Sequence, residues 1–130
     1  TNSFTGHRFF SGIGGTQTLS RAVGEKRAKE IIFSAQTFSS KEALEWGLVN
    51  AVFPKETLLS NTINCAKKIV ANAPIAVQQA KKSIQLGLQS TLLRGMEIEL
   101  ECYNKSVRTF DRKEGVLAFN EKRLPKFKGH

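Results

Sequence analysis

A single short stretch of the chain has the alternating pattern of a β-strand, and this stretch limits the possible folds most. Residues 48–53 read LVNAVF, which is rich in β-branched and aromatic residues, and Pro54 follows. The pattern predicts a strand at about 48–53. A lone strand cannot satisfy its own backbone hydrogen bonds, and no other segment of the sequence predicts a partner strand. We therefore expect the back half of a larger fold that is also an obligate oligomer.

Helices are expected on both sides of this strand. Ahead of it, the spacing of apolar residues predicts helices at about 15–23 and 26–34. Ser39 and Glu42 then have the spacing of a capping box at the start of a third helix, and Gly47 suits the left-handed residue after its end.

After the strand, apolar residues recur every three to four positions. A helix is predicted over 55–72, and Ala73-Pro74 breaks it. The apolar stripes of the next two helices are Val77, Ala80, Ile84 and Leu88, and then Leu92, Met96, Leu100, Tyr103 and Val107. Asp111 as a cap and Glu114 in the box position predict a last helix from Arg112 to about Arg123, followed by a basic tail.

The composition is that of one globular domain. The 130 residues are 40% hydrophobic and 24% charged, which is ordinary for a folded soluble protein. No apolar run reaches the roughly 20 residues that span a bilayer, so we expect no membrane segment. Cys65 and Cys102 lie in helical patterns without metal-ligand spacing, which favours reduced core residues and a cytosolic or mitochondrial compartment.

The net charge of +9 is unevenly placed. From Lys105 to His130 there are eight Lys and Arg against three acidic residues, so more than half of the excess lies in the last fifth of the chain. Such a segment suits phosphate groups, on RNA or on a phosphorylated cofactor. One Tyr, one Trp and no interleaved basic and aromatic platform weigh against RNA. A charged, frayed tail is the default interpretation of Arg123, Lys126 and Lys128.

Three glycines near the start of the sequence indicate a backbone that closely approaches either a ligand or another segment of the chain. Gly12, Gly14 and Gly15 precede a Thr-Gln pair, without the strand of a dinucleotide fingerprint or the Gly-Lys-Ser/Thr of a phosphate loop. Either a glycine amide, that of Gly12 above all, faces a ligand, or the glycines only permit a tight turn and close helix packing. Both interpretations stay open.

Several segments taken together resemble a known family. These are GIGGTQTLSRAVG, then KEALEWGLVNAVFP, NAPIAVQQAKKSI and DRKEGVLAFNEKRLPKFKGH. They are similar to the crotonase (enoyl-CoA hydratase/isomerase) superfamily, and to its enoyl-CoA hydratases most, over about 11–130. The resemblance implies an α/β fold: the C-terminal part of a ββα spiral, mostly α-helical in this chain with one short strand. It implies three parts, namely a non-family or disordered lead at 1–10, the end of the core at 11–54, and a helical region at 55–130 for trimerisation and coenzyme A contact.

The resemblance also implies a reaction, the hydration of 2-enoyl-CoA to 3-hydroxyacyl-CoA. The coenzyme A thioester is the substrate, and no prosthetic group or metal is expected. In such hydratases two glutamates handle the water and two backbone amides form the oxyanion hole, all from segments preceding the GGTQ stretch. Residues 1–10 contain no Asp or Glu. We therefore expect no catalytic residue in this chain and no hydratase activity from it alone, whether the cause is truncation, proteolysis or a disrupted gene.

Two residues near the end of the chain are the candidate coenzyme A contacts. Phe119 and Lys122 are three apart, so a helix would place an aromatic ring beside an ammonium, which suits adenine and a phosphate. The family uses the matching positions for coenzyme A. Gly12, as the first glycine of the family motif, is a candidate wall of the acyl site through its amide.

Two function hypotheses follow. The first is the C-terminal portion of an enoyl-CoA hydratase of fatty-acid or branched-chain amino-acid degradation, in a homotrimer or a dimer of trimers. The alternative is a basic RNA-binding subunit, or a pseudoenzyme or structural subunit of a crotonase-like oligomer. The compartment would be the cytoplasm of a bacterium or the mitochondrial matrix of a eukaryote.

Overall fold

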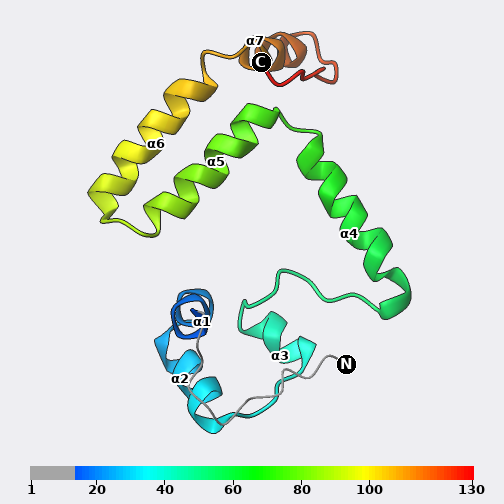
Figure 1. The fold of residues 1–130 in the computed structure, drawn as a ribbon. Helices are drawn as coiled ribbons and strands as arrows, with labels where there is room; N and C mark the ends of the chain where they lie inside the picture. The colour runs from blue at the N-terminus through cyan, green and yellow to red at the C-terminus, as the bar shows by residue number, and fades with distance from the viewer. Residues whose placement is uncertain (1–13) are drawn as a thin grey trace. The chain divides into compact units, whose positions relative to one another are not determined.

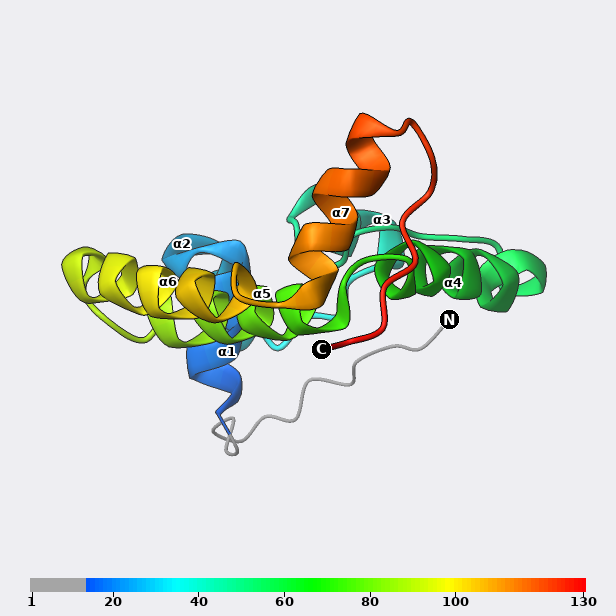
Figure 2. The same cartoon turned by 90° about the horizontal axis from the view of Figure 1, so that it is seen from above.

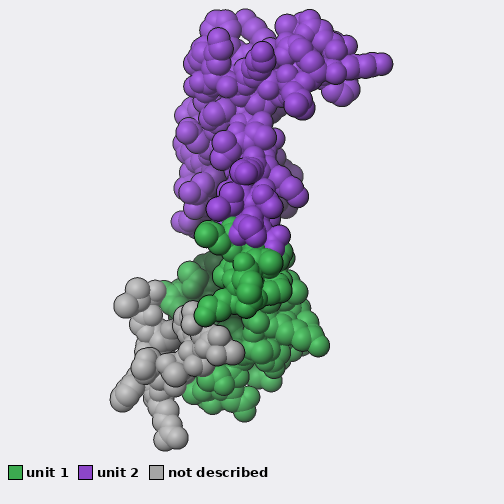
Figure 3. Space-filling view, turned by 90° about the vertical axis from the view of Figure 1, so that its right-hand side faces the viewer, with its two compact units in different colours: residues 1–59 green, residues 60–130 purple. Residues whose placement is uncertain are grey.

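The structure is a computed structural model that describes residues 14–130, and over these residues it is built from helices alone (Figure 1). The helices are α1 (Gly15–Val23), α2 (Glu25–Ser34), α3 (Ser40–Glu45), α4 (Lys55–Val70), α5 (Pro74–Gly87), α6 (Leu92–Ser106) and α7 (Phe110–Asn120). The chain forms two compact units, unit 1 with residues 1–59 and unit 2 with residues 60–130 (Figure 3).

The strand predicted at 48–53 is wrong. Residues 46–50 form turns and bends, and residues 51–54 have no regular structure. The amides of Leu48 and Val49 both donate to the carbonyl oxygen of Ala43, at 2.9 and 3.3 Å, and so close the end of α3. Within the described residues no strand lies beside this segment, so its β-type side chains alone cannot make a sheet.

Unit 1 follows the sequence prediction closely in its helices. The predicted helices at 15–23 and 26–34 are confirmed as α1 and α2, which pack together around the buried Ala28. Gly24 separates them with a φ of 82°, which a side chain would rarely permit.

The start and end of α3 also match the prediction. The side-chain oxygen of Ser39 accepts from the Glu42 amide, and the Glu42 carboxylate accepts from the Ser39 amide. This is the complete capping box, and Gly47 takes the expected left-handed conformation with a φ of 72°. Trp46 lies against Phe38 at 5.2 Å between ring centroids, with the Arg27 guanidinium 4.7 Å above its ring. These contacts give Trp46 a packing role within unit 1.

In unit 2, α5 and α6 lie side by side as a hairpin (Figure 1). Thr91 caps α6 by accepting from the Arg94 amide. The two helices approach closely at a pair of glycines, since a Cβ on Gly95 would lie 3.5 Å from the Cα of Gly87. Glycines at facing positions let the two backbones come together.

Few side chains of unit 2 are buried, and they are not those of the predicted stripes. Ile98 and Cys102 of α6 are buried, whereas the stripe residues Leu92 and Met96 are exposed, Leu92 by 78%. Cys65, predicted as a core residue, is exposed on α4, because no described residue covers it there; both cysteines are free thiols. Much of each apolar stripe is therefore exposed within unit 2, including Ile84 and Leu88 of the first stripe and Leu92, Met96 and Leu100 of the second.

The glycine contact generates a prediction about the size of residue 95. Gly95→Ala places a methyl at an ordinary contact distance from Gly87 and raises helix propensity, so we expect stabilisation of up to about 1 kcal/mol. Gly95→Leu overfills the contact and we expect a loss of about 1–3 kcal/mol. Thermal unfolding followed by circular dichroism measures both. A loss from Gly95→Ala as large as that from Gly95→Leu would contradict the observed approach of α5 and α6.

Candidate functional site

Of the three glycines near the start of the sequence, Gly14 and Gly15 are described and Gly12 is not. Gly12 lies outside the described residues, as does the lead at 1–10. Gly14 is described: it precedes α1 with a φ of 79°, and its carbonyl oxygen accepts from the amides of Gln17 and Thr18 at 3.0 and 2.9 Å. This geometry supports the tight-turn interpretation for Gly14.

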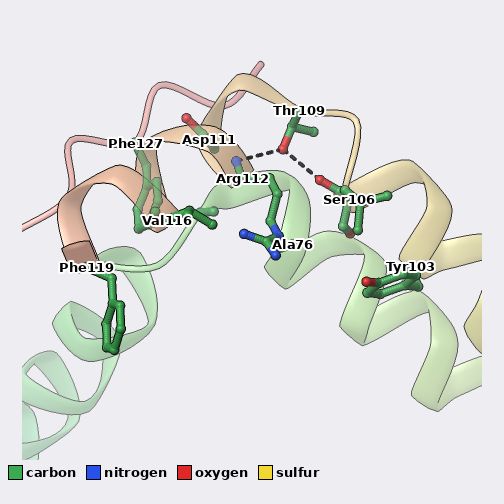
Figure 4. A pocket seen from close by; sticks show the side chains of 12 residues that line it. Ala76, Tyr103, Ser106, Thr109, Asp111, Arg112, Val116, Phe119 and Phe127 are labelled. Atoms are coloured by element: carbon green, nitrogen blue, oxygen red, sulfur yellow. Dashed lines mark hydrogen bonds between the residues drawn. The ribbon is translucent and has the colours of Figure 1, made fainter.

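The start of α7 differs from its prediction, because Thr109 and not Asp111 is the cap. Thr109 Oγ1 accepts from the Arg112 amide at 3.1 Å and donates to the Ser106 carbonyl oxygen at 2.8 Å (Figure 4). The helix consequently begins at Phe110, and Asp111 lies within its first turn. The predicted capping box of Asp111 and Glu114 is therefore wrong.

Asp111 instead binds the far end of the chain. It is 2% exposed, and its two carboxylate oxygens accept from the amides of Lys128 and Gly129, each at 2.7 Å. The Asp111 amide in turn donates to the His130 carbonyl oxygen at 3.2 Å. We call residues 124–130 the C-terminal strap; it runs back alongside α7 (Figure 2). The prediction of a frayed tail is wrong, because Asp111 holds the strap.

Glu114, one turn further along α7, makes the second set of contacts to this end of the chain. Its carboxylate accepts from both terminal nitrogens of Arg123, at 2.6 and 3.0 Å, and from the Lys126 amide at 2.7 Å. These hydrogen bonds, that from Arg123 first and that from Lys126 second, lower the pKa of Glu114 to about 2. Glu121 also accepts from Arg123 Nε at 2.6 Å, and the two carboxylates raise the pKa of Arg123.

The two candidate coenzyme A contacts lie at the end of α7. The helix ends at Asn120, earlier than predicted, so Lys122 lies beyond it and does not share a helix face with Phe119. The two residues are still joined, because the Lys122 amide donates to the Phe119 carbonyl oxygen at 3.2 Å. Phe119 is 83% exposed. In the described part of the chain no hydrogen bond or ion pair holds the Lys122 ammonium.

A pocket of about 380 Å³ opens within unit 2, and Phe119 but not Lys122 is among its lining residues. It is bordered by α5, α6, α7 and the strap, and Figure 4 shows Phe119 and Phe127 at its edge. Its lining is Ala73, Ala76, Tyr103, Ser106, Val107, Thr109, Asp111, Arg112, Gly115, Val116, Phe119 and Phe127. Gly115 lies close to the Phe127 ring, since a Cβ there would lie 3.6 Å from it, at an ordinary contact distance.

Other chemistry has little support in the described residues. Among them, no group of three or more His, Cys, Asp or Glu side chains is arranged to hold a metal ion. In the same residues no helix is both long and apolar enough to cross a bilayer. Asp111, the one carboxylate in the pocket lining, is already engaged by strap amides, as is Glu114 of the same helix.

Comparison with known proteins decides the family. The family model described as enoyl-CoA hydratase/isomerase matches residues 2–130. The chain belongs to this family. Its helices are those of the C-terminal part of the crotonase fold, since a crystal structure of enoyl-CoA hydratase from Bacillus anthracis superposes with a TM-score of 0.92 at 44% identity, over 95% of this chain and 48% of that one.

Curated relatives of this enoyl-CoA hydratase/isomerase family member include mitochondrial enzymes. The mitochondrial enoyl-CoA hydratase of Pongo abelii is 40% identical over 117 residues, which are 90% of this chain and 40% of that protein. The human mitochondrial methylglutaconyl-CoA hydratase is 40% identical over 122 residues, 91% of this chain and 36% of that protein. The chain thus spans less than half the length of each of these relatives.

Sequence reasoning missed Asp111 and Glu114 as the residues that hold the strap. Their partners lie 17 or 18 and 12 residues away, and those partners are backbone amides, which every residue except proline possesses. No local pattern marks an amide as the partner of a distant carboxylate. The one sequence signal for these contacts was the presence of three acidic residues within an otherwise basic segment.

The lowered pKa of Glu114 predicts how this carboxylate titrates and contributes to stability at low pH. A carboxylate whose pKa is depressed on folding contributes stability that is present above its ordinary pKa of 4.5 and is lost as the pH falls through about 2. We expect the Glu114 carboxyl carbon, followed by NMR, to titrate near pH 2. A Glu114 midpoint at the ordinary value would show that the Arg123 and Lys126 contacts do not form in solution.

Proposed function

We propose that this chain is the coenzyme A-contacting, C-terminal portion of an enoyl-CoA hydratase, which adds water to 2-enoyl-CoA to give 3-hydroxyacyl-CoA. The family membership supports the substrate class. The observation that carries the role of this portion is the pairing at the end of α7, where an exposed Phe119 ring is joined through the backbone to a Lys122 ammonium without a partner in the described residues.

Phe119 is proposed to stack on the adenine ring. At 83% exposure it is not a core residue of unit 2, although an exposed ring of this size is unfavourable in water. A flat aromatic face beside a pocket suits a nucleotide base, since base–aromatic stacking contributes about 1–3 kcal/mol per base. Stacking on Phe119 would therefore favour binding of a nucleotide over binding of a simple acyl chain.

Lys122 is proposed to bind a phosphate of the same coenzyme A molecule. Its neighbour Arg123 is neutralised by Glu114 and Glu121, so Arg123 has no free charge to offer a ligand. The ammonium of Lys122 has no such partner in the described residues, and lysine binds phosphates as a point charge.

The chain is proposed to lack the hydratase chemistry itself. Asp111 in the pocket lining and Glu114 of the same helix accept backbone and guanidinium donors, which leaves neither available to move a proton to or from water. Gly12 is the candidate wall of the acyl site through its amide. The catalytic carboxylates and the oxyanion amides would come from other sequence of the same enzyme.

The assembly is proposed to be a homotrimer or a dimer of trimers. The apolar stripe of α6 supports this, since Leu92, Leu93, Met96 and Leu100 are all more than half exposed. Contiguous apolar surface of this kind marks a surface that another chain or segment covers. The curated relatives named above are mitochondrial, and we propose the mitochondrial matrix for a eukaryotic source and the cytoplasm for a bacterial one.

Substitution of Phe119 and Lys122 tests the proposed contacts. We expect Phe119→Ala and Lys122→Ala each to weaken binding of acyl-CoA about tenfold, from lost stacking and a lost charge-assisted contact. Isothermal titration with butyryl-CoA measures this. Lys113→Ala is the matched control, because it removes a lysine of α7 that lies over Phe110 instead, and it is expected to leave the affinity unchanged.

Salt dependence separates this proposal from the RNA-binding alternative. Binding of an RNA by the basic segment would fall steeply with salt, because each phosphate contact releases counterions. Acyl-CoA affinity should depend on the acyl chain and much less on salt. Tight RNA binding that Lys113→Ala and Lys122→Ala weaken equally, with no measurable acyl-CoA binding, would overturn the proposed function.

A further inference from the structure

Lys122 occupies a backbone conformation that its own side chain does not favour. Its φ is 54°, in the left-handed region that residues other than glycine, asparagine and aspartate adopt rarely. Such a conformation persists only where the surroundings hold it. The residues on either side of Lys122 therefore decide from where, and how firmly, its ammonium is presented.

The backbone before and after Lys122 is fixed by two different sets of contacts. On the helix side, the Lys122 and Arg123 amides donate to the carbonyl oxygens of Phe119 and Ala118, at 3.2 and 3.0 Å. On the strap side, Glu114 holds the Arg123 guanidinium with both oxygens and also the Lys126 amide. Glu114 is thus the side chain that ties the residues after the turn back to α7.

We propose that Glu114 is a positioning residue for Lys122: by holding Arg123 and Lys126 against α7, it fixes the turn that presents the Lys122 ammonium to the phosphate of a nucleotide. This inference rests on the proposed function of Phe119 and Lys122. Glu114 itself touches no ligand, because its two oxygens are occupied within the chain. It therefore affects how strongly the site prefers a ligand that carries this phosphate, and not the affinity for the rest of the ligand.

Glu121 provides a matched control within the same cluster. It carries the same charge and accepts from the same arginine, at Arg123 Nε, but it makes no contact with a strap amide. It is also the residue next to Lys122. Glu121→Gln therefore changes the local charge as much as Glu114→Gln does, while it leaves the Lys126 amide and the paired Arg123 contact in place.

The test compares two ligands that differ by one phosphate. Coenzyme A carries a 3′-phosphate on its ribose and dephospho-coenzyme A does not, and the affinity of the wild-type chain and of both variants is measured for each ligand. We expect wild type and Glu121→Gln to prefer coenzyme A by about tenfold, as for one charge-assisted phosphate contact. For Glu114→Gln we expect most of this preference to disappear, with little change in affinity for dephospho-coenzyme A.

Amide exchange of the same proteins, followed by NMR, provides a readout independent of any ligand. In Glu114→Gln the Lys126 amide should exchange faster, whereas the amides within α5 and α6 should not change. An equal loss of affinity for both ligands would mean a merely structural role, and an equal loss of preference in Glu121→Gln would mean a charge effect, so either result overturns the inference. A wild-type chain that does not distinguish the two ligands, with its Lys126 amide protected, would instead overturn the proposed function on which the inference depends.

Discussion

The arrangement of unit 2 around its pocket depends on one buried carboxylate. Asp111 accepts the amides of Lys128 and Gly129, and without it these donors would lack a partner inside the protein. The C-terminal strap has no helix or strand to satisfy its backbone, so a side chain must do so. A carboxylate suits this task because it accepts two amides at once, and hydrogen bonds to a charged acceptor are the stronger kind.

The Asp111 interaction also fixes how the C-terminal strap packs against α7 and brings Glu114 close to the strap. With the strap closed on α7, Phe127 lies against Gly115 at the pocket edge, and the left-handed Gly129 lies close to Pro74 at the start of α5. The same closure brings the Lys126 amide to the Glu114 carboxylate. Glu114 also binds Arg123, the residue that follows Lys122. A basic segment is thus converted into an ordered one, in which Arg123 is paired with Glu114 and Glu121 while no hydrogen bond or ion pair among the described residues holds the Lys122 ammonium.

The helices could be predicted from the sequence because their signals are local. Ser39 and Glu42 accept from amides within one turn, Gly47 takes a left-handed backbone conformation, and each was found in its predicted place. The strand at 48–53 could not be judged in the same way, since β-type residues form a strand only beside another one. Asp111 and Glu114 were misassigned for a related reason. A carboxylate can either cap a helix or accept from a distant amide, and the sequence does not indicate which amide donates to the carboxylate.

The candidate site was predictable in part. The aromatic and basic residues at 119 and 122 are visible in the sequence, but their common helix face is not what joins them, since α7 ends at Asn120. The left-handed conformation of Lys122 lies in the turn that closes α7, where the Lys122 and Arg123 amides donate to the carbonyl oxygens of Phe119 and Ala118, and the sequence prediction placed this turn later in the chain. The proposed coenzyme A ligand comes from the family membership, because the local geometry alone does not name a ligand.

Hydrogen exchange at the Lys128 and Gly129 amides tests the central claim most directly. The account predicts that both amides are strongly protected in the wild-type chain. In Asp111→Asn, which retains one carbonyl oxygen, one of the two amides should lose its protection, while the amides of Ile98 and Cys102 in α6 keep theirs. Exchange of the Lys128 and Gly129 amides at unprotected rates in the wild-type chain, with α6 intact, would contradict the account.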